Sequence, residues 1–151
     1  MSMITCIIFD WKRTLYNPDT KKLIIGAKEI LGYLKEKNIP LVLIGKGGDD
    51  MQEEVKRLGV QDFFTSILFT EEKKDTEFFT PFVSKHNPQS TLFIGDRMQS
   101  EIAIGNKLGC TTMWIKQGKF AKEKVNAQTG NPSYIADSLV SCLGKIKKLV
   151  N

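Results

Sequence analysis

The sequence is poor in the residues from which disulfide frameworks and zinc sites are built. Its 151 residues include three cysteines and one histidine. The cysteines are odd in number and lack metal-ligand spacing, so we expect buried free thiols and neither a redox centre nor a zinc site. The single histidine ends a helix-like segment, where a surface or electrostatic role is favoured over catalysis. These residues are Cys6, Cys110, Cys142 and His86.

Long hydrophobic runs are also absent. The apolar runs at residues 4–9, 41–44 and 91–94 have the length of strands, and none approaches the roughly 18 residues that span a bilayer. The chain starts directly in the first of these runs, without the charged-then-apolar pattern of a secretory signal. We therefore expect no membrane association, and the expected location is the cytoplasm.

Length and composition indicate one ordinary folded unit. With 41% hydrophobic and 26% charged residues, the chain is close to average globular proteins and unlike disordered or fibrous ones. A length near 150 predicts a single domain over residues 1–151, with no room for a second module. The net charge of +5 favours anionic partners.

Short β-branched apolar runs alternate along the chain with segments of helical period, a pattern typical of βαβ units. Because crossovers in such units are right-handed, we predict a three-layer, Rossmann-like α/β fold with a parallel sheet of about five strands. The expected strands are residues 4–10, 40–44, 66–69, 91–94 and 111–115, and the expected helices are residues 26–37, 49–58, 75–86, 99–108 and 135–150.

Two aspartates follow apolar strands of this expected sheet. Asp10 ends the first strand and Asp96 follows the fourth. Parallel α/β sheets bind ligands at the carboxyl ends of their strands, and carboxylates there suit Mg²⁺, which combines one or two of them with waters and a substrate phosphate. Asp10 would then lie beside a phosphoryl group that it could attack. The alternative is that each aspartate caps the helix that follows it.

The motifs around these aspartates resemble those of the haloacid dehalogenase-like (HAD) hydrolases. Residues 7–15, IIFDWKRTL, resemble the family's first motif, an apolar strand followed by Asp-x-Asp-Gly-Thr-Leu in which the first Asp is phosphorylated. Residues 92–96, LFIGD, together with Glu101, are similar to the fourth motif. Residues 73–79, KKDTEFF, match the third motif in spacing. The resemblance covers nearly the whole chain.

The resemblance implies a role for each matching residue. Asp10 would be the nucleophile and a Mg²⁺ ligand, Asp96 and Glu101 would be further ligands, and Lys12 would supply a backbone carbonyl to the metal. Lys73, at the position of the third motif's lysine, would neutralise the phosphoryl oxygens and orient Asp10. The implied reaction is hydrolysis of a phosphorylated small molecule or macromolecule through an aspartyl phosphate.

Two positions depart from the family pattern. The family's phosphatases carry a second Asp that protonates the leaving group and then activates water, and this chain has Lys12 there. A lysine is normally protonated at neutral pH and is a poor general base, so hydrolysis should be impaired. The phosphate-binding Ser or Thr of the second motif is replaced by Gly45. The backbone N–H groups of Lys46, Gly47 and Gly48 could receive the anion instead, and a plain tight turn is the equal alternative.

The segment between the first motif and the first helix has room for a β-hairpin flap and not for a cap domain, and no insertion follows the second motif. The resemblance therefore implies the capless branch of the family, with sheet order 5-4-1-2-3. Capless members act on large substrates or complete their site by forming oligomers. The short segment is residues 16–25.

Two functions stay open at this point. The first is a HAD-like phosphohydrolase, Mg²⁺-dependent and of reduced activity. The alternative is a catalytically impaired relative that binds a phosphorylated ligand or partner without turnover. Nucleic acid is a less favoured substrate, because the lysines after the fifth strand are better explained as a solvated charged loop. They are Lys116, Lys119, Lys122 and Lys124.

Overall fold

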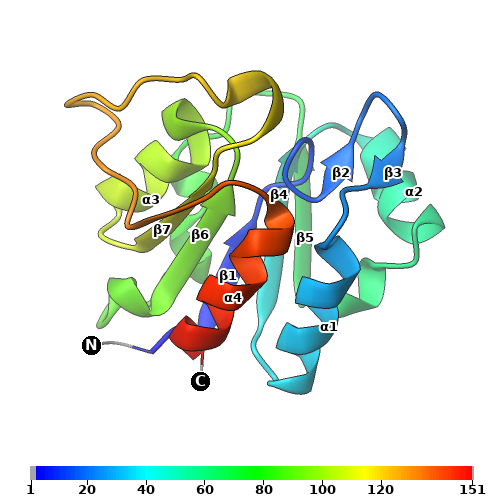
Figure 1. Ribbon diagram of the computed structural model, residues 1–151, viewed down its shortest axis with the longest axis horizontal. Helices are drawn as coiled ribbons and strands as arrows, with labels where there is room; N and C mark the ends of the chain where they lie inside the picture. The colour runs from blue at the N-terminus through cyan, green and yellow to red at the C-terminus, as the bar shows by residue number, and fades with distance from the viewer. Residues whose placement is uncertain (1–2, 151) are drawn as a thin grey trace.

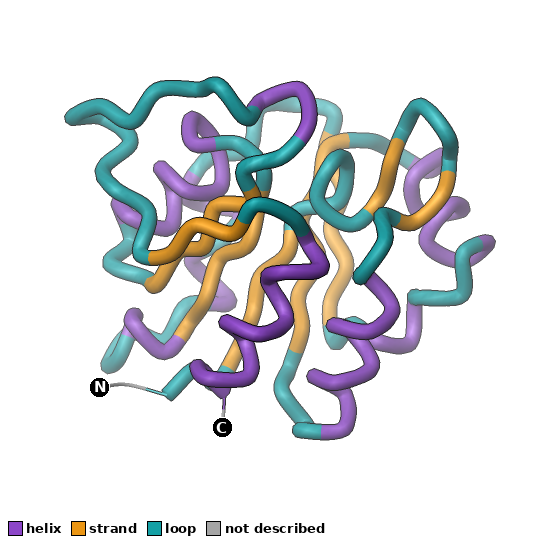
Figure 2. Tube along the Cα trace, viewed as in Figure 1, coloured by secondary structure: helices purple, strands orange, loops and turns teal. Residues whose placement is uncertain are grey.

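A computed structural model describes residues 3–150, and a parallel sheet runs through its centre (Figure 1, Figure 2). Its strands lie in the order β5-β4-β1-β6-β7-β8, and every neighbouring pair is parallel. The predicted α/β class and the order 5-4-1-2-3 of the predicted strands are confirmed, and the sheet has one strand more than expected. The strands are β1 (Cys6–Phe9), β4 (Leu41–Lys46), β5 (Ser66–Thr70), β6 (Thr91–Gly95), β7 (Thr111–Ile115) and β8 (Tyr134–Ala136).

Helices and turns cover both faces of the sheet, because successive strand residues point to opposite sides. On one face, Ile7 and Phe9 share a core with buried residues of α1 and α4, the two helices in front of the sheet in Figure 1. On the other face, Ile8 belongs to a second core with Phe79 and Phe93. None of the helices within residues 3–150 is long and apolar enough to cross a membrane. The α-helices are α1 (Ala27–Glu36), α2 (Asp49–Arg57), α3 (Ala103–Lys107) and α4 (Leu139–Val150).

The prediction of a helix at residues 75–86 is wrong. Two short 3₁₀ turns, Thr76–Phe78 and Thr80–Phe82, take its place. Pro81 lies in the middle of the predicted helix, where it lacks the N–H that an α-helix requires. Between the two turns, Phe79 is fully buried, with its ring 5.3 Å from that of Phe93. Packing of this segment against the second core, with Phe79 at its centre, therefore holds it in place of a helical hydrogen-bond ladder.

The helix predicted at residues 135–150 divides into a strand and a shorter helix. The first of these residues belongs to β8, where Ile135 pairs with Trp114 of β7. The helix α4 begins only after Ser138, whose side-chain oxygen accepts a hydrogen bond from the backbone N–H of Ser141 at 3.1 Å. This N-cap sets the start of the helix, and the residues before it are free to extend the sheet.

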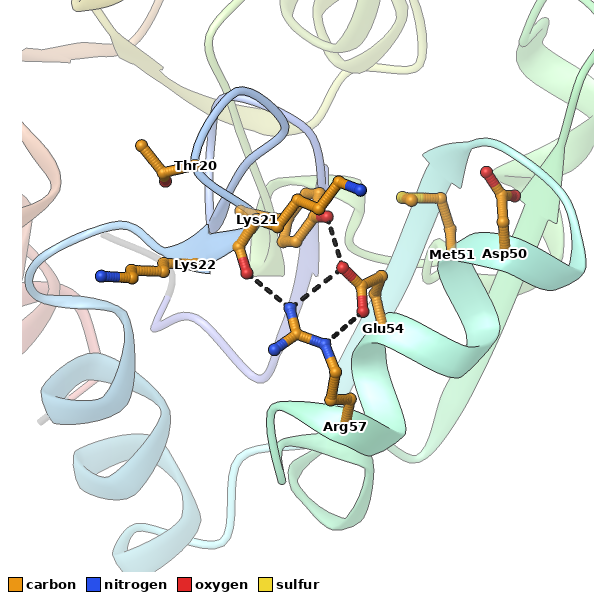
Figure 3. Close-up of a pocket in the computed structure, with 8 residues that line it drawn as sticks. Thr20, Lys21, Lys22, Asp50, Met51, Glu54 and Arg57 are labelled. Atoms are coloured by element: carbon orange, nitrogen blue, oxygen red, sulfur yellow. Dashed lines mark hydrogen bonds and ion pairs between the residues drawn. The ribbon is translucent and has the colours of Figure 1, made fainter.

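The β-hairpin predicted between the first motif and the first helix is confirmed. It consists of β2 (Tyr16–Asn17) and β3 (Lys22–Leu23), which pair in antiparallel fashion. Figure 3 shows how side chains of α2 hold it. The Tyr16 hydroxyl donates to Glu54 at 2.7 Å, and Arg57 donates both to Glu54 and to the carbonyl oxygen of Lys21. A cavity of about 520 Å³ lies between the hairpin and the helix.

Close packing of α3 on the sheet makes Gly105 a sensitive position. A Cβ there would lie 2.6 Å from Thr112 Cγ2 and 2.9 Å from Phe93 Cγ. We predict that Gly105→Ala destabilises the protein by about 1–3 kcal/mol, although alanine is the better helix former. Denaturant unfolding measures the change.

Gly144 of α4 is the matched control, because a Cβ at this exposed position meets nothing within 4 Å. Gly144→Ala should stabilise the protein by about 0.5–1 kcal/mol through helix propensity alone. Equal effects of the two substitutions would contradict the packing argument.

Candidate active site

Asp10 and Asp96 meet at the carboxyl edge of the sheet because β1 and β6 are parallel neighbours. Asp10 directly follows β1, and its backbone N–H donates to the carbonyl oxygen of Ile94 at 3.1 Å. Asp96 directly follows β6, and its carbonyl oxygen accepts a hydrogen bond from the indole N–H of Trp114 at 2.9 Å. Both aspartates are buried. Backbone pairing and the indole therefore fix the backbone positions of both aspartates independently of any ligand.

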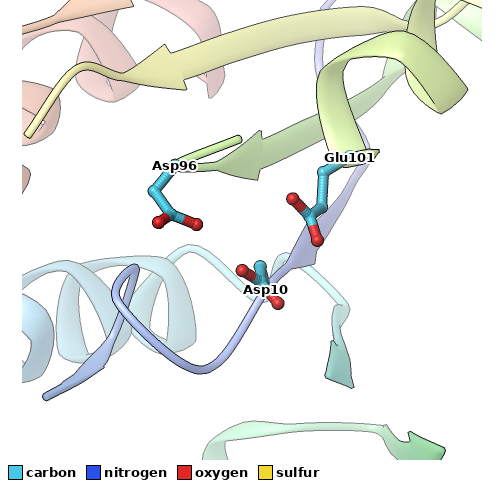
Figure 4. A group of neighbouring side chains, drawn as sticks. All are labelled: Asp10, Asp96 and Glu101. Atoms are coloured by element: carbon cyan, nitrogen blue, oxygen red, sulfur yellow. The ribbon is translucent and has the colours of Figure 1, made fainter. Parts of the chain in front are cut away.

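A third carboxylate, Glu101, reaches the same place from the segment after β6 (Figure 4). The helix predicted at residues 99–108 is here a π-helical turn, Met98–Ile102, that continues into α3. Glu101 lies in this turn and is buried. One oxygen from each of Asp10, Asp96 and Glu101 lies within 4.8 Å of the others. We call these three residues the acidic cluster.

The cation in contact with the acidic cluster is Lys74. Its Nζ lies 3.0 Å from Asp10 Oδ1, also contacts Glu101, and donates to the carbonyl oxygen of Ile44 at 3.4 Å. The lysine side chain is only 3% exposed. Lys73, which the motif spacing selected, is exposed and is one of the residues that line the cavity around the acidic cluster. The structure thus brings together Asp10 and the next lysine along, one residue beyond the predicted one.

The pKa values of Asp96 and Glu101 reflect the excess of negative charge in the acidic cluster. Burial, followed by the charges of Asp10 and Glu101, raises the pKa of Asp96 to about 8. Burial and then Asp10 raise the pKa of Glu101 as well. Burial would lower the pKa of Lys74, but the two carboxylates that it contacts outweigh burial and raise this pKa above its usual value. One lysine is too little positive charge for three buried carboxylates.

Two oxygens of the acidic cluster fit a metal ligand set. Asp96 Oδ2 and Glu101 Oε2 are buried and have no hydrogen-bond partner among the described residues. Buried polar atoms are rarely left unpaired, and carboxylate oxygens are the ligands that Mg²⁺ prefers. The residues present therefore fit a small divalent cation.

The turn after Asp10 is held by contacts that extend to α2. Trp11 is buried and its ring stacks on Tyr16, with centroids 5.1 Å apart and planes 7° apart. Hydrogen bonds from Arg57 and then Tyr16 lower the pKa of Glu54 to about 2, so this carboxylate stays ionised as an acceptor. The chain of contacts from α2 through the hairpin to Trp11 fixes the residue that follows the candidate nucleophile.

Thr14 is a site residue that the sequence analysis did not select. Its Oγ1 lies 3.4 Å from Asp10 Oδ2 and 3.4 Å from Asp96 Oδ1, and the residue is fully buried. It belongs to the first-motif segment, four residues after the aspartate. The sequence signal that could have found it is a hydroxyl residue four positions after the aspartate of the first motif.

The predicted anion-binding turn after β4 is not available to an anion at Gly47. The Gly47 N–H donates to the carbonyl oxygen of Thr70 at 3.0 Å, because β4 pairs with β5 up to its last residue. The next N–H, of Gly48, donates to Asp50 Oδ1 at 3.0 Å. Lys46 is among the residues that line the cavity around the acidic cluster.

Gly45, at the phosphate-binding position of the second motif, has a structural explanation. A Cβ at this position would lie 2.9 Å from the Cβ of Trp11 and 2.9 Å from the ring of Phe69. The glycine therefore makes room for the tryptophan after Asp10, and it does not line the cavity. The Ser or Thr that the second motif has in the family would require these neighbours to move.

The acidic cluster forms the floor of a cavity of about 450 Å³. Lys12, which the sequence analysis selected, is among the residues that line it. Arg97 lies 3.1 Å from Glu123, and its guanidinium carbon lies 4.2 Å from the centre of the Phe120 ring. Above the floor, all charged lining residues are cations, which we call the cationic rim: Lys12, Arg13, Lys46, Lys73 and Arg97.

The sequence of this chain matches a family model and known proteins. The HAD-hydrolase-like family model matches residues 69–142, which include Lys74, Asp96 and Glu101. A glyceraldehyde 3-phosphate phosphatase of Pyrococcus furiosus is 29% identical over 104 residues, which are 64% of this chain and 43% of that protein. The chain thus spans less than half the length of this relative, and its capless, single-domain organisation stays a prediction.

Solved structures share the fold. A HAD-superfamily hydrolase from Ehrlichia chaffeensis matches with a TM-score of 0.74 and 18% identity over 100% of both chains. The HAD-hydrolase YfnB from Bacillus subtilis, bound to magnesium, matches with a TM-score of 0.67 and 23% identity, covering 87% of this chain and 57% of that one. The chain therefore matches the HAD-hydrolase-like family model over residues 69–142 and shares the fold of HAD-superfamily hydrolases.

Proposed function

We propose that this chain is a Mg²⁺-dependent phosphohydrolase in which Asp10 is the nucleophile. The observation that carries the proposal is the acidic cluster, whose oxygens lie within 4.8 Å of one another beside Lys74. Lys74 donates to Asp10 Oδ1, and Oδ2, which accepts from the Thr14 hydroxyl at 3.4 Å, would be the oxygen that reacts. The cavity above the cluster gives a phosphoryl group access to that oxygen.

Asp10, Asp96 and Glu101 would hold the metal ion, since two of their oxygens are buried without partners. Mg²⁺ bound there would neutralise the cluster and polarise the phosphoryl group. The backbone carbonyl of Lys12 as a further ligand stays a prediction. The magnesium in the structure of YfnB and the phosphatase activity named for the Pyrococcus furiosus relative support this assignment.

The rate of the reaction then depends on the leaving group. Asp10 attacks phosphorus, and the leaving oxygen takes the electron pair of the broken bond. With Lys12 in place of the family's acid–base aspartate, the position from which the family protonates the leaving group carries no carboxylic acid. The same replacement removes the base that would activate water against the aspartyl phosphate. The proposed enzyme is therefore of reduced activity and favours leaving groups that depart as stable anions.

A second candidate function follows from the same residue. If Lys12 stops the reaction altogether, the cavity with its cationic rim would bind a phosphorylated ligand without turnover. Substrates that differ only in their leaving group separate the two functions.

We expect Mg²⁺-dependent hydrolysis of aryl and acyl phosphates, such as 4-nitrophenyl phosphate and acetyl phosphate, and little hydrolysis of glycerol 3-phosphate. Asp10→Asn should abolish it, and Lys12→Asp should raise activity on the alkyl ester by about 10²-fold or more, the usual contribution of a general acid. Phosphate release measures both. The enzyme proposal fails if the wild-type protein shows no metal-dependent turnover of any of these esters.

The two neighbouring lysines provide a matched pair of variants. Lys74→Met removes the buried cation on Asp10, so we expect kcat for 4-nitrophenyl phosphate to fall by about 10²-fold or more. Lys73→Met changes an exposed side chain and should cost at least about tenfold less. Circular dichroism checks that each variant is folded. A larger loss in the Lys73 variant would contradict the assignment of Lys74.

The raised pKa of Asp96 predicts how stability depends on pH. Between its ordinary value of 3.8 and about 8, the folded state binds this proton and the unfolded chain does not. The metal-free protein should therefore become less stable as pH rises through this window. Mg²⁺ favours the ionised cluster and should raise Tm more at pH 8 than at pH 5.

Thermal unfolding in chelator and in Mg²⁺ measures this dependence, and Asp96→Asn should remove most of it. Stability of the metal-free protein that increases between pH 5 and pH 8 would be inconsistent with a buried, mutually repelling cluster.

A further inference from the structure

The cavity of the proposed active site contains more positive charge than a simple phosphate ester requires. Six cationic residues and three acidic residues line it, and all three acidic residues belong to the acidic cluster. A divalent ion on the cluster would increase the positive excess. The dianion of one phosphoryl group would leave several of these charges unmatched.

The cationic rim is held in place by contacts that leave its charges available. Within residues 3–150, neither Lys12, Arg13, Lys46 nor Lys73 forms an ion pair with a carboxylate. Arg97 has a partner in Glu123, which lies outside the cavity lining. These cations come from the last residue of β4 and from the segments after β1, β5 and β6, so the topology of the sheet gathers them around one opening.

Two contacts position members of the rim. The ring of Phe120 lies 4.2 Å from the guanidinium carbon of Arg97 and 6.0 Å from that of Arg13, so it holds both arginines beside the opening. Lys46 Nζ donates to the carbonyl oxygens of Glu71 and Glu72, at 3.1 Å and 2.7 Å. That contact fixes the loop from which Lys73 emerges.

Lys12 also restricts which leaving groups the site can release. No carboxylic acid is available at this position to protonate the leaving group, so it must depart as a stable anion. A cationic rim stabilises such an anion directly. A phosphate attached through a bridging oxygen satisfies both conditions, because it leaves without needing a proton and carries charge for the rim to bind.

We propose, on the basis of the proposed function, that the substrate is a phosphoanhydride whose leaving group is itself a phosphate held by the cationic rim. Asp10 forms a bond to the terminal phosphorus, the bond from that phosphorus to the bridging oxygen breaks, and its electron pair leaves with the bridging oxygen. Water then attacks the aspartyl phosphate, which restores the Asp10 carboxylate and releases inorganic phosphate, while the proton of water passes to solvent.

The test compares substrates that all have good leaving groups. We expect kcat/KM for inorganic pyrophosphate, with Mg²⁺, to exceed that for 4-nitrophenyl phosphate by about tenfold or more, the effect of one charge-assisted contact or more. Methylenediphosphonate should inhibit hydrolysis of 4-nitrophenyl phosphate at least about tenfold more strongly than methylphosphonate, because only the former carries the second anionic group.

Variants of the rim locate the effect. Arg13→Asn suits the left-handed backbone at this position, where φ is 65°, and Lys73→Gln changes an exposed side chain. Each should lower the ratio of kcat/KM for pyrophosphate to that for 4-nitrophenyl phosphate by about tenfold, mainly through KM. Lys28→Gln, on the exposed face of α1 and outside the cavity, is the control and should leave the ratio at the wild-type value.

The outcomes separate the two proposals. Hydrolysis of 4-nitrophenyl phosphate with no preference for pyrophosphate, or a preference that the rim variants leave intact, overturns the phosphoanhydride proposal and leaves the proposed function standing. Metal-dependent hydrolysis of neither compound overturns both. A preference for pyrophosphate that falls in both rim variants and stays in the Lys28 variant supports the phosphoanhydride assignment.

Discussion

Three buried carboxylates at one point of the sheet set the constraint on which the rest of the structure depends. Burial and mutual repulsion both oppose ionisation, which is why the pKa of Asp96 rises to about 8. Lys74 supplies one buried positive charge, and without such a partner a buried carboxylate is strongly destabilising. One cation does not balance three carboxylates. The unpartnered oxygens of Asp96 and Glu101 mark where further positive charge belongs.

The fold keeps these charges together by means that do not depend on a ligand. Neighbouring parallel strands end beside each other, so Asp10 and Asp96 are brought together by strand pairing. The stacked rings of Trp11 and Tyr16 and the hydrogen bonds to Glu54 then fix the turn after Asp10 against α2. Preorganised charges of this kind need no rearrangement when a reaction begins, and this is the main way in which enzymes stabilise transition states.

Much of this could be predicted from the sequence, and the failures have physical causes. Hydrophobic patterning predicted β1, β4, β5, β6 and β7, and the motifs predicted Asp10 and Asp96, because both signals are local in the sequence. The choice between Lys73 and Lys74 depends on which side chain is buried against the sheet, and adjacent lysines look alike in a motif. The missing helix at residues 75–86 and the extra strand β8 depend on Pro81 and on pairing with β7. Gly45 reflects the volume of Trp11, which spacing does not reveal.

The central claim is that the acidic cluster is a cation site beside a nucleophilic aspartate, with Lys12 as the residue that changes the family's chemistry. A crystal structure of the protein soaked with Mg²⁺ and a phosphate mimic tests it most directly. The account predicts an ion bound by oxygens of Asp10, Asp96 and Glu101, with Lys74 still on Asp10 and the mimic facing Asp10 Oδ2. An empty cluster, or a mimic bound away from Asp10 at saturating concentrations of both, would contradict it.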